Sequence, residues 1–326
     1  MTYLLRNLLP RPLHALNSFA RPAISRYRTM STPPKLPPSS WDSHMHIVNP
    51  DKYPLALDAQ YVPPVHTLSD AMTFESSVDI RNIVLVQPSI YGFDNSCMLD
   101  GLKELGSSQG RAVVSLDPDN QPPEDTLRSW HQWGVRGVRL NLQSTGRELS
   151  AEELKTIMHK YADIIRPYGW VLQLYIALPH VPPLVDIVSN LGVKVCLDHF
   201  GSPKLPSPAS STSHTTTFDP YSLSGFTEMI NLLEGGHTYV KISAAYRLTS
   251  NPQFDGLREM CMEFMRVAPE RIVFATDWPH TRFDSVDIVP FMKACVDWCH
   301  GDQGMIDKLF RCNAEELWDV KAVTEP

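Results

Sequence analysis

The chain has 326 residues, of which 43% are hydrophobic and 20% are charged, and its formal net charge is −7 at pH 7. This composition is typical of a globular protein, and the length suits one large barrel or two ordinary domains. The negative charge and the lack of any Lys/Arg run in the body of the chain argue against a nucleic-acid-binding surface. No uninterrupted apolar stretch reaches the roughly 18 residues that would predict a membrane span.

The first forty residues differ from the rest of the chain. They contain five arginines and Lys35 but no acidic residue, and the first acid is Asp42. An arginine-rich, serine-containing, acid-free segment predicts a mitochondrial transit peptide. The proline- and serine-rich residues 31–40 predict a linker. We therefore expect a targeting segment and linker over residues 1–40 and a catalytic domain over residues 41–326. If translation instead starts at Met30, the expected location is cytoplasmic.

Eight short, β-branched apolar runs predict strands. They are Trp41–Ile47, Asn82–Gln87, Ala112–Leu116, Val135–Leu140, Val171–Ile176, Val193–Asp198, Tyr239–Ser243 and Ile272–Thr276. Stretches with helical periodicity lie between many of them, at Ala151–Tyr168, Leu184–Leu191, Leu223–Leu233, Gln253–Val267 and Ile288–Trp298. A capping box at Ser150–Glu153 marks one helix start. Eight alternating strands and helices predict an α/β fold, the (β/α)8 TIM barrel. An open doubly wound sheet is less favoured because no GxGxxG follows the first strand.

Polar side chains gather where the predicted strands end. The residues concerned are His44, His46, Ser89, Asn95, Arg136, Arg139, Tyr175, Asp198, His199, Lys241, Arg247 and Asp277. A single histidine at a strand end is usually structural. Several histidines, acids and arginines at the same end of different strands are harder to explain that way, because buried charge is costly unless it is paired. In a barrel these strand ends line the active site.

A long polar segment rich in Pro, Ser and Thr follows the sixth predicted strand, at residues 202–220. A loop after a strand end should lie over the catalytic face, so we expect a loop or lid there. A disordered insertion is the alternative interpretation.

Three motifs carry a family resemblance. They are HxH at His44 and His46, LDH at Leu197–His199, and TDWPH at Thr276–His280. In this order they resemble the amidohydrolase superfamily, and within it the amidohydrolase-2 branch that contains 2-pyrone-4,6-dicarboxylate lactonases. The segments at residues 86–95 and 134–141 are also similar to those of the lactonases. The resemblance spans nearly all of Trp41–Asp319 and implies the same barrel.

The resemblance also bears on metal binding. Most members of the superfamily bind one or two divalent metals through strand-one histidines, a strand-four lysine or glutamate, histidines of strands five and six, and a strand-eight aspartate. This chain has arginines on strand four and Tyr175 on strand five, which argues against a two-metal centre. Similarity to the lactonases implies a site that works without metal. The alternative is a single Zn²⁺ on His44, His46, His199 and Asp277, since three protein ligands and an open position suffice for catalytic zinc.

The chemistry of lactone opening assigns a role to each residue type. Asp277 is the expected general base, and His44, His46 and His199 are expected to polarise the carbonyl. The expected substrate-binding residues are Ser89, Asn95, Arg136, Arg139, Tyr175 and Arg247. Arg136 is the weaker candidate because, three residues before Arg139, it points to the opposite face of a strand. Lys241 is interpreted as a paired lysine rather than a substrate contact.

These observations favour a lactonase-type hydrolase that needs no metal and acts on a small lactone bearing a carboxylate. Pyrone dicarboxylates, muconolactone-like compounds and sugar-acid lactones all fit. One alternative is a mononuclear zinc hydrolase, or a nonoxidative decarboxylase of an aromatic acid, on the same fold. Another is a catalytically silent relative that binds a carboxylate ligand. We expect no nucleic-acid or membrane partner.

Overall fold

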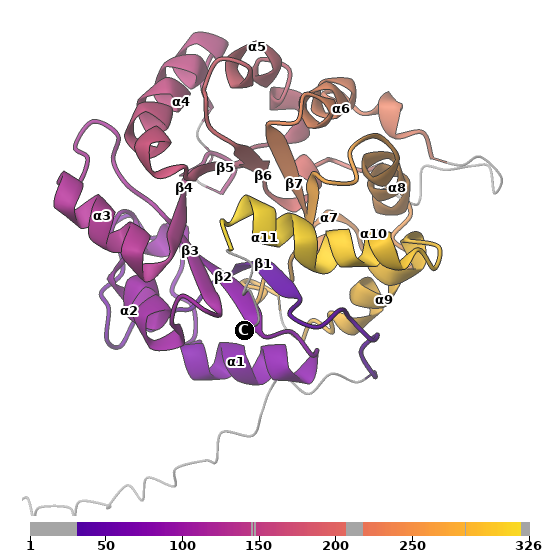
Figure 1. Ribbon diagram of the computed structural model, residues 1–326, viewed down its shortest axis with the longest axis horizontal. Helices are drawn as coiled ribbons and strands as arrows, with labels where there is room; N and C mark the ends of the chain where they lie inside the picture. The colour runs from indigo at the N-terminus through magenta and orange to yellow at the C-terminus, as the bar shows by residue number, and fades with distance from the viewer. Residues whose placement is uncertain (1–30, 145, 147, 207–217, 284, 321–326) are drawn as a thin grey trace, which may run out of the picture.

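Eight parallel strands form one sheet in sequence order, and helices surround it (Figure 1). The computed structural model describes residues 31–144, 146, 148–206, 218–283 and 285–320. The predicted (β/α)8 barrel is therefore confirmed. Most of the predicted targeting segment, residues 1–30, and the middle of the predicted lid, residues 207–217, lie outside the described residues.

The predicted strands differ from the observed ones by no more than two residues at either end. The strands are β1 Trp41–Met45, β2 Asn82–Val86, β3 Gly110–Val114, β4 Val135–Asn141, β5 Val171–Tyr175, β6 Val195–Leu197, β7 Thr238–Ile242 and β8 Ile272–Phe274. The helices are α1 Leu68–Ser77, α2 Ser96–Leu105, α3 Glu124–Trp133, α4 Ala151–Ile165, α5 Leu184–Val188, α6 Phe226–Glu234, α7 Ala245–Leu248, α8 Leu257–Val267, α9 Val289–Trp298, α10 Gln303–Asp307 and α11 Asn313–Leu317. The sequence predictions did not include α1, α2, α3, α7, α10 and α11.

Capping side chains fix where two of the helices start. The Thr67 hydroxyl accepts a hydrogen bond from the Asp70 N–H, and the Asp70 carboxylate accepts one from the Thr67 N–H. Ser150 and Glu153 make the same reciprocal pair at α4, as the sequence predicted. Each pair satisfies two backbone donors that the first turn would leave unpaired.

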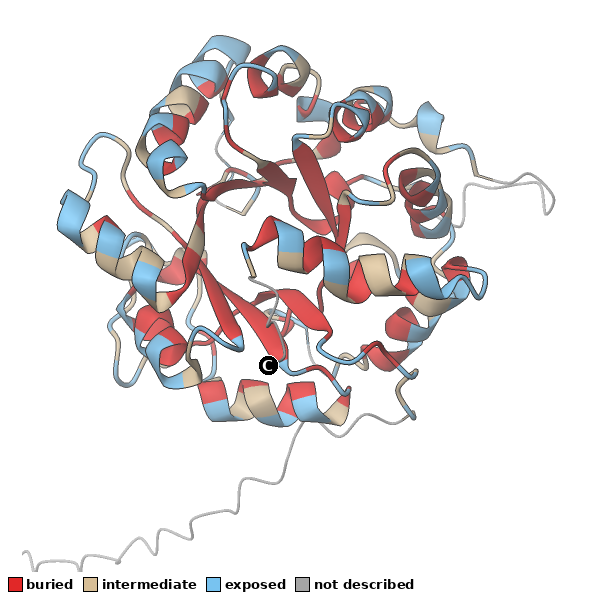
Figure 2. Cartoon of the chain, in the orientation of Figure 1, coloured by how far each residue is buried: buried red, intermediate tan, exposed pale blue. Residues whose placement is uncertain are grey.

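Apolar side chains fill the barrel interior near the strand starts, and α11 covers that end (Figure 1). Val84, Val113 and Val171 pack there against Trp318, which directly follows α11 and is fully buried. The Trp318 indole donates a hydrogen bond of 3.2 Å to the Ser43 hydroxyl. Figure 2 shows that the strands are buried and that the helices expose their outer faces. This end is packed, so a pocket has to form at the other end.

The barrel closes between β1 and β8 at the end opposite α11. The Asp277 N–H donates to the His44 carbonyl at 3.0 Å, and the His46 N–H donates to the Trp278 carbonyl at 2.8 Å. The pairing of β1 with β2 shifts register between Asp42 and Met45. Such bulges re-aim side chains. Ser43 can thus contact the packed end of the barrel while the next residue, His44, belongs to the opposite end.

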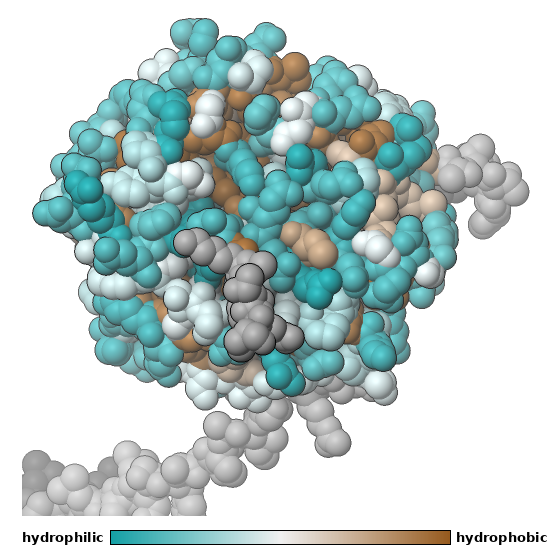
Figure 3. All heavy atoms as spheres, viewed as in Figure 1, coloured by the Kyte–Doolittle hydropathy of each residue, from teal (hydrophilic) through white to brown (hydrophobic). Residues whose placement is uncertain are grey.

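The face that carries α11 is mostly hydrophilic, with apolar side chains scattered across it (Figure 3). Among the described residues, none of the helices is both long enough and apolar enough to cross a membrane.

Candidate active site

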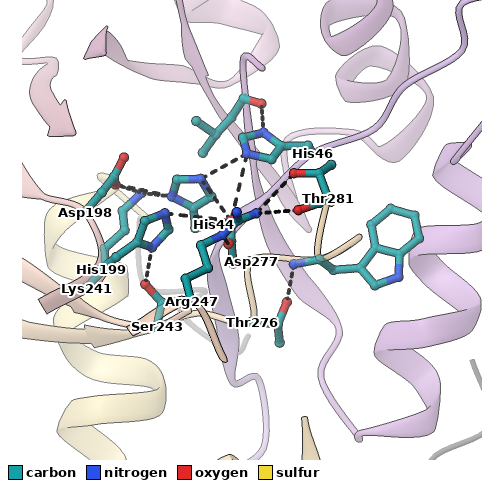
Figure 4. A network of polar contacts seen from close by, with 12 residues as sticks. His44, His46, Asp198, His199, Lys241, Ser243, Arg247, Thr276, Asp277 and Thr281 are labelled. Carbon is teal, nitrogen blue, oxygen red and sulfur yellow. Dashed lines mark hydrogen bonds and ion pairs between the residues drawn. The ribbon is translucent and has the colours of Figure 1, made fainter. Parts of the chain in front are cut away.

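Three imidazoles and one carboxylate meet at the carboxyl end of the barrel (Figure 4). His44 and His46 extend from β1, and their Nε2 atoms lie 3.3 Å apart. His199 follows β6, with its ring centroid 4.8 Å from that of His44. The Nε2 atoms of His44, His46 and His199 lie 3.7, 3.9 and 3.8 Å from Asp277 Oδ1. One carboxylate oxygen therefore has three imidazole nitrogens around it.

The other oxygen of Asp277 is held by two donors from α7. The Tyr246 hydroxyl donates to Oδ2 at 2.6 Å, and Arg247 Nε donates to it at 2.8 Å. Arg247 Nη2 also donates to the Thr281 carbonyl and hydroxyl, both at 3.1 Å. Burial alone would raise the pKa of Asp277, but its electrostatic interactions with His199 and Arg247 outweigh burial and hold the pKa far below its usual range. Asp277 is therefore ionised, with one oxygen anchored and one presented to the imidazoles.

A buried charge network lies behind His44. Asp198 accepts hydrogen bonds from Arg139 Nη2 at 3.3 Å and from Gln173 Nε2 at 3.1 Å, and its other oxygen lies 3.3 Å from Lys241 Nζ. Lys241 also donates to Gln173 Oε1 at 2.7 Å. Burial opposes ionisation of Asp198, yet Lys241 and His44 outweigh it and keep the pKa well below the ordinary value. Lys241 is paired, as expected, but it also lies beside His44.

His44 has a donor and an acceptor at the same ring nitrogen. Its Nδ1 lies 3.2 Å from Asp198 Oδ1 and 3.2 Å from Lys241 Nζ. An ammonium group can only donate and a carboxylate can only accept. If Nδ1 donates to Asp198, Nε2 carries a lone pair; if Nδ1 accepts from Lys241, Nε2 carries the proton. Burial and the charge of Lys241 hold the pKa of His44 well below 6.5, so the ring is neutral.

The other two imidazoles are also neutral at pH 7. His46 Nδ1 lies 2.7 Å from the Val86 carbonyl, which can only accept, so the proton sits on Nδ1 and Nε2 carries a lone pair. Burial, with help from Arg139, lowers the pKa of His46 to about 4. His199 Nδ1 lies 2.8 Å from the Ser243 hydroxyl, and burial lowers its pKa as well.

This donor set fits a single divalent cation. His44, His199 and Asp277 each offer one ligand atom, and these atoms lie within 4.8 Å of one another. The 3.3 Å between the Nε2 atoms of His44 and His46 matches the separation of about 3.3 Å expected for two nitrogens bound to tetrahedral zinc. Partners at Nδ1 of each ring resemble the outer contacts that orient metal-binding histidines. Lys241 is the exception, because a cation is an unusual partner there.

Two further buried carboxyl groups, those of Asp42 and Glu75, lie close to the ends of β1 and β8. Asp42 Oδ1 accepts from the backbone N–H of His44 at 2.9 Å and of Thr276 at 3.0 Å, and Oδ2 accepts from the Thr276 hydroxyl. Burial raises the pKa of Asp42 to about 6. Glu75 of α1 is fully buried, and burial together with the Asp42 charge raises its pKa well above 4.5. Asp42 thereby ties β1 to β8 next to the site.

The site opens into a cavity of about 230 Å³. Three arginines, Arg139, Arg247 and Arg282, line it together with Asp277. Its wall also includes His46, Tyr61, Ser89, Tyr175, His199 and Thr281. Three guanidinium groups around one carboxylate make the cavity suited to an anion, which arginine binds with paired, charge-assisted hydrogen bonds.

Two of the predicted substrate-binding residues, Arg136 and Asn95, do not line this cavity. Arg136 lies at the strand start, where its guanidinium bonds the Asp319 carboxylate at 3.1 Å and the His131 carbonyl at 2.8 Å. The Asn95 side chain donates hydrogen bonds to the carbonyls of Phe93 and Ser115 and accepts one from the Ser115 N–H, so it holds the backbone of a loop in place. Substrate contact by Arg136 or Asn95 does not fit these positions. Ser89, Arg139, Tyr175 and Arg247 do line the cavity.

Sequence reasoning missed several residues of the site. Tyr246, Tyr61 and Arg282 were not considered. Tyr246 directly precedes Arg247, and Arg282 lies two residues after the TDWPH motif, so their neighbours offered a signal. Tyr61 lies in the long segment between β1 and α1 and carries no local signal of function.

Comparison with known families gives one broad match. The sequence model described as "Amidohydrolase" matches residues 41–320, which covers the barrel and every residue of the site.

Comparisons with individual proteins agree with that match. The chain is 28% identical over 260 residues to a 4-sulfomuconolactone hydrolase of Hydrogenophaga intermedia, covering 78% of this chain and 79% of that protein. It is 27% identical over 257 residues to a 2-pyrone-4,6-dicarboxylate hydrolase of Comamonas testosteroni, covering 76% and 78%. A solved structure from Pseudomonas putida, a candidate 2-pyrone-4,6-dicarboxylic acid hydrolase, has a TM-score of 0.68 at 26% identity, covering 87% of this chain and 98% of that one.

Proposed function

Because the chain belongs to the amidohydrolase family, we propose that it is a hydrolase that opens an anionic lactone. Similarity to proteins named 4-sulfomuconolactone hydrolase and 2-pyrone-4,6-dicarboxylate hydrolase supports this substrate class. Pyrone dicarboxylates, muconolactone-like compounds and sugar-acid lactones are the substrates we would test. The observation that carries the proposal is a carboxylate facing three imidazoles beside an arginine-lined cavity.

The reaction sets the demands on the site. The oxygen of a water molecule bonds to the lactone carbonyl carbon, and the bond from that carbon to the ring oxygen breaks. The water gives up a proton, and the ring oxygen takes one as it leaves. One group that accepts and then returns a proton can serve both steps.

We assign this proton transfer to Asp277 Oδ1. Its partner oxygen is held by Tyr246 and Arg247, so the carboxylate has a fixed orientation. The low pKa keeps Asp277 ionised but makes it a weak base. A substrate carboxylate that shares the Arg247 charge would raise the proton affinity of Asp277. The base would then be strongest when substrate is bound.

We assign donation to the carbonyl oxygen to His44 rather than to His46, whose Nε2 carries a lone pair. Lys241, by donating to Nδ1, favours the form of His44 that carries its proton on Nε2. A fixed donor of this kind stabilises negative charge as it develops on the oxygen. The Tyr175 ring packs edge-on against His199 with centroids 5.0 Å apart, and we assign its hydroxyl a similar role. We assign recognition of substrate carboxylates to Arg139 and Arg282, with Ser89 as a further contact.

A second candidate is a zinc-dependent hydrolase, or an aromatic-acid decarboxylase, and the convergent donor atoms favour it. His44, His46, His199 and Asp277 would hold the ion. A bound Zn²⁺ would polarise the carbonyl and lower the pKa of a water molecule. Orientation of the substrate would still fall to the arginines of the cavity.

A panel of lactones with a pH indicator tests the proposal, with and without chelator. Asp277→Asn should lower kcat about 10³-fold or more, as expected for a lost general base. Arg139→Gln should raise KM by about ten- to a hundredfold, from loss of a charge-assisted contact. Arg136→Gln, on the same strand but at the other end, is the matched control and should leave both constants unchanged. If no anionic lactone is opened, or if Asp277→Asn is as active as the wild type, the proposal is wrong. Activity lost with chelator and restored by zinc favours the second candidate.

We also propose that residues 1–40 direct the protein to mitochondria, on the basis of their arginine-rich, acid-free composition. A fluorescent protein fused to residues 1–40 should localise to mitochondria, and diffuse cytoplasmic fluorescence would contradict this.

A further inference from the structure

A second cavity adjoins the catalytic one. Its volume is about 550 Å³, more than twice that of the catalytic cavity. It lies between residues 61–64 and 66, which precede α1, and residues 279–283, 285 and 286, which follow β8. Polar residues, among them His66 and His280, make up part of its wall. The apolar half of the wall consists of Val62, Pro63, Pro64, Pro279, Phe283 and Val286.

The two cavities share part of their walls. Tyr61, Thr281 and Arg282 line both of them. The Arg282 guanidinium lies 4.4 Å from the centroid of the Tyr61 ring, so these two side chains form the boundary between the cavities. A ligand whose polar end occupies the catalytic cavity can therefore extend past Tyr61 and Arg282 into the second one.

Two apolar side chains in the wall of the second cavity are exposed. Val62 is 77% exposed and Phe283 is 42% exposed. Phe283 is also close to the catalytic groups, because its ring packs edge-on against Tyr246 at 4.9 Å and lies 5.3 Å from the Arg247 guanidinium. Exposed apolar side chains that line a hollow next to a reactive site are typical of a ligand-binding surface.

We propose that this second cavity binds an alkyl or aryl substituent of the substrate, so that the preferred substrate is an anionic lactone with an apolar arm. This inference rests on the proposed function for the identity of the polar end. The apolar arm would contact Val62, Phe283 and Val286 while the lactone ring lies beside Asp277. The preferred substrate is thus a larger molecule than a pyrone dicarboxylate without such a substituent.

A homologous series of carboxylated lactones with unbranched alkyl substituents tests the inference. Each buried methylene should raise kcat/KM about three- to fourfold until the cavity is filled. Val62→Trp should flatten this rise and leave kcat/KM for the unsubstituted lactone unchanged. Leu57→Trp is the matched control, because Leu57, like Val62, is an exposed apolar residue before α1, but it does not line the cavity. A flat series in the wild type, or an equal rise in Val62→Trp, would overturn the inference.

Binding of lactam analogues separates this inference from the proposed function. Lactams with the same alkyl series resist hydrolysis, so their effect on the melting temperature reports binding alone. A stabilisation that grows with chain length, and that Val62→Trp abolishes, supports the apolar subsite even if no lactone is hydrolysed. A series of lactams with equal effects would reject the subsite even if short lactones are good substrates.

Discussion

The buried pair of Asp198 and Lys241 allows a prediction that does not depend on the identity of the substrate. Both side chains are fully buried, and their charged atoms lie 3.3 Å apart. At an effective dielectric constant of about 20 this separation corresponds to an attraction of about 5 kcal/mol. Desolvation offsets much of that gain, so the informative quantity is the cost of removing one partner, about 3–5 kcal/mol for a buried pair.

The two single variants should differ. Asp198→Asn leaves two buried cations, Lys241 and Arg139, without their shared carboxylate, so we expect a loss of about 5 kcal/mol. Lys241→Met leaves Asp198 bonded to Arg139 and Gln173, so we expect a loss of about 2–3 kcal/mol. The double variant should cost less than the sum, because Lys241 no longer needs a partner. We expect a coupling energy of about 2 kcal/mol.

Urea unfolding followed by tryptophan fluorescence measures these three free energies. Lys194→Met is the matched control, because Lys194 pairs with Glu316 at 3.5 Å on the surface, where a salt bridge contributes little. Costs of Asp198→Asn and Lys241→Met that simply add, or an Asp198→Asn variant no less stable than Lys241→Met, would refute the reasoning.

Three further predictions concern single groups. Because the pKa of His46 is about 4, kcat/KM should stay level from pH 8 to about pH 5 and fall below that; a fall centred near pH 6.5 would contradict this. Glu75→Gln removes a buried acid that ionises more readily in the unfolded chain than in the folded protein. The variant should therefore be more stable than the wild type, and the difference in their free energies of unfolding should grow from pH 5 to pH 8. An equal difference at both pH values would contradict the raised pKa of Glu75. Tyr246→Phe removes the 2.6 Å hydrogen bond to Asp277 and should lower kcat about tenfold with KM unchanged, whereas a change in KM alone would point to substrate contact.

The barrel could be predicted because its strands are fully buried. A parallel strand covered on both sides needs a continuous β-branched run, and such runs stand out in a sequence. The helices were harder to predict. Helix α1 contains Thr73 and a buried Glu75 among its apolar residues, so its periodicity is weak. What specifies α1 is the Thr67–Asp70 capping box, a signal confined to four residues.

The cluster of histidines and Asp277 could be predicted in part for a similar reason. In a parallel barrel the strand ends converge, so His44, His46, His199 and Asp277 had to be neighbours once the strands were assigned. Arg136 was the weaker candidate because side chains alternate along a strand, which turns it away from the face that carries Arg139, and in the structure it pairs with Asp319 instead. The contact between Arg282 and Tyr61 joins two loops that are far apart in the sequence, so it depends on tertiary structure and could not be predicted from local sequence.

The charges at the site link its two candidate ligands. Lys241, Arg139, Arg247 and Arg282 carry four positive charges, whereas Asp198 and Asp277 carry two negative ones, and the imidazoles are neutral. An anionic substrate therefore offsets the excess positive charge of the site, while a divalent cation bound alone would add to it. We accordingly expect zinc and a carboxylate ligand to bind cooperatively, each tightening the other by the same factor.

Calorimetric titration of the protein with zinc, in the absence and in the presence of a saturating carboxylated lactam, would measure that coupling. Competition between the lactam and a strong chelator for bound zinc gives an independent value. We expect zinc affinity to rise at least tenfold in the presence of the lactam, and to rise in its absence when Lys241→Met removes one positive charge beside His44. Zinc affinity that is indifferent to both changes would mean that the charge balance does not govern what the site binds.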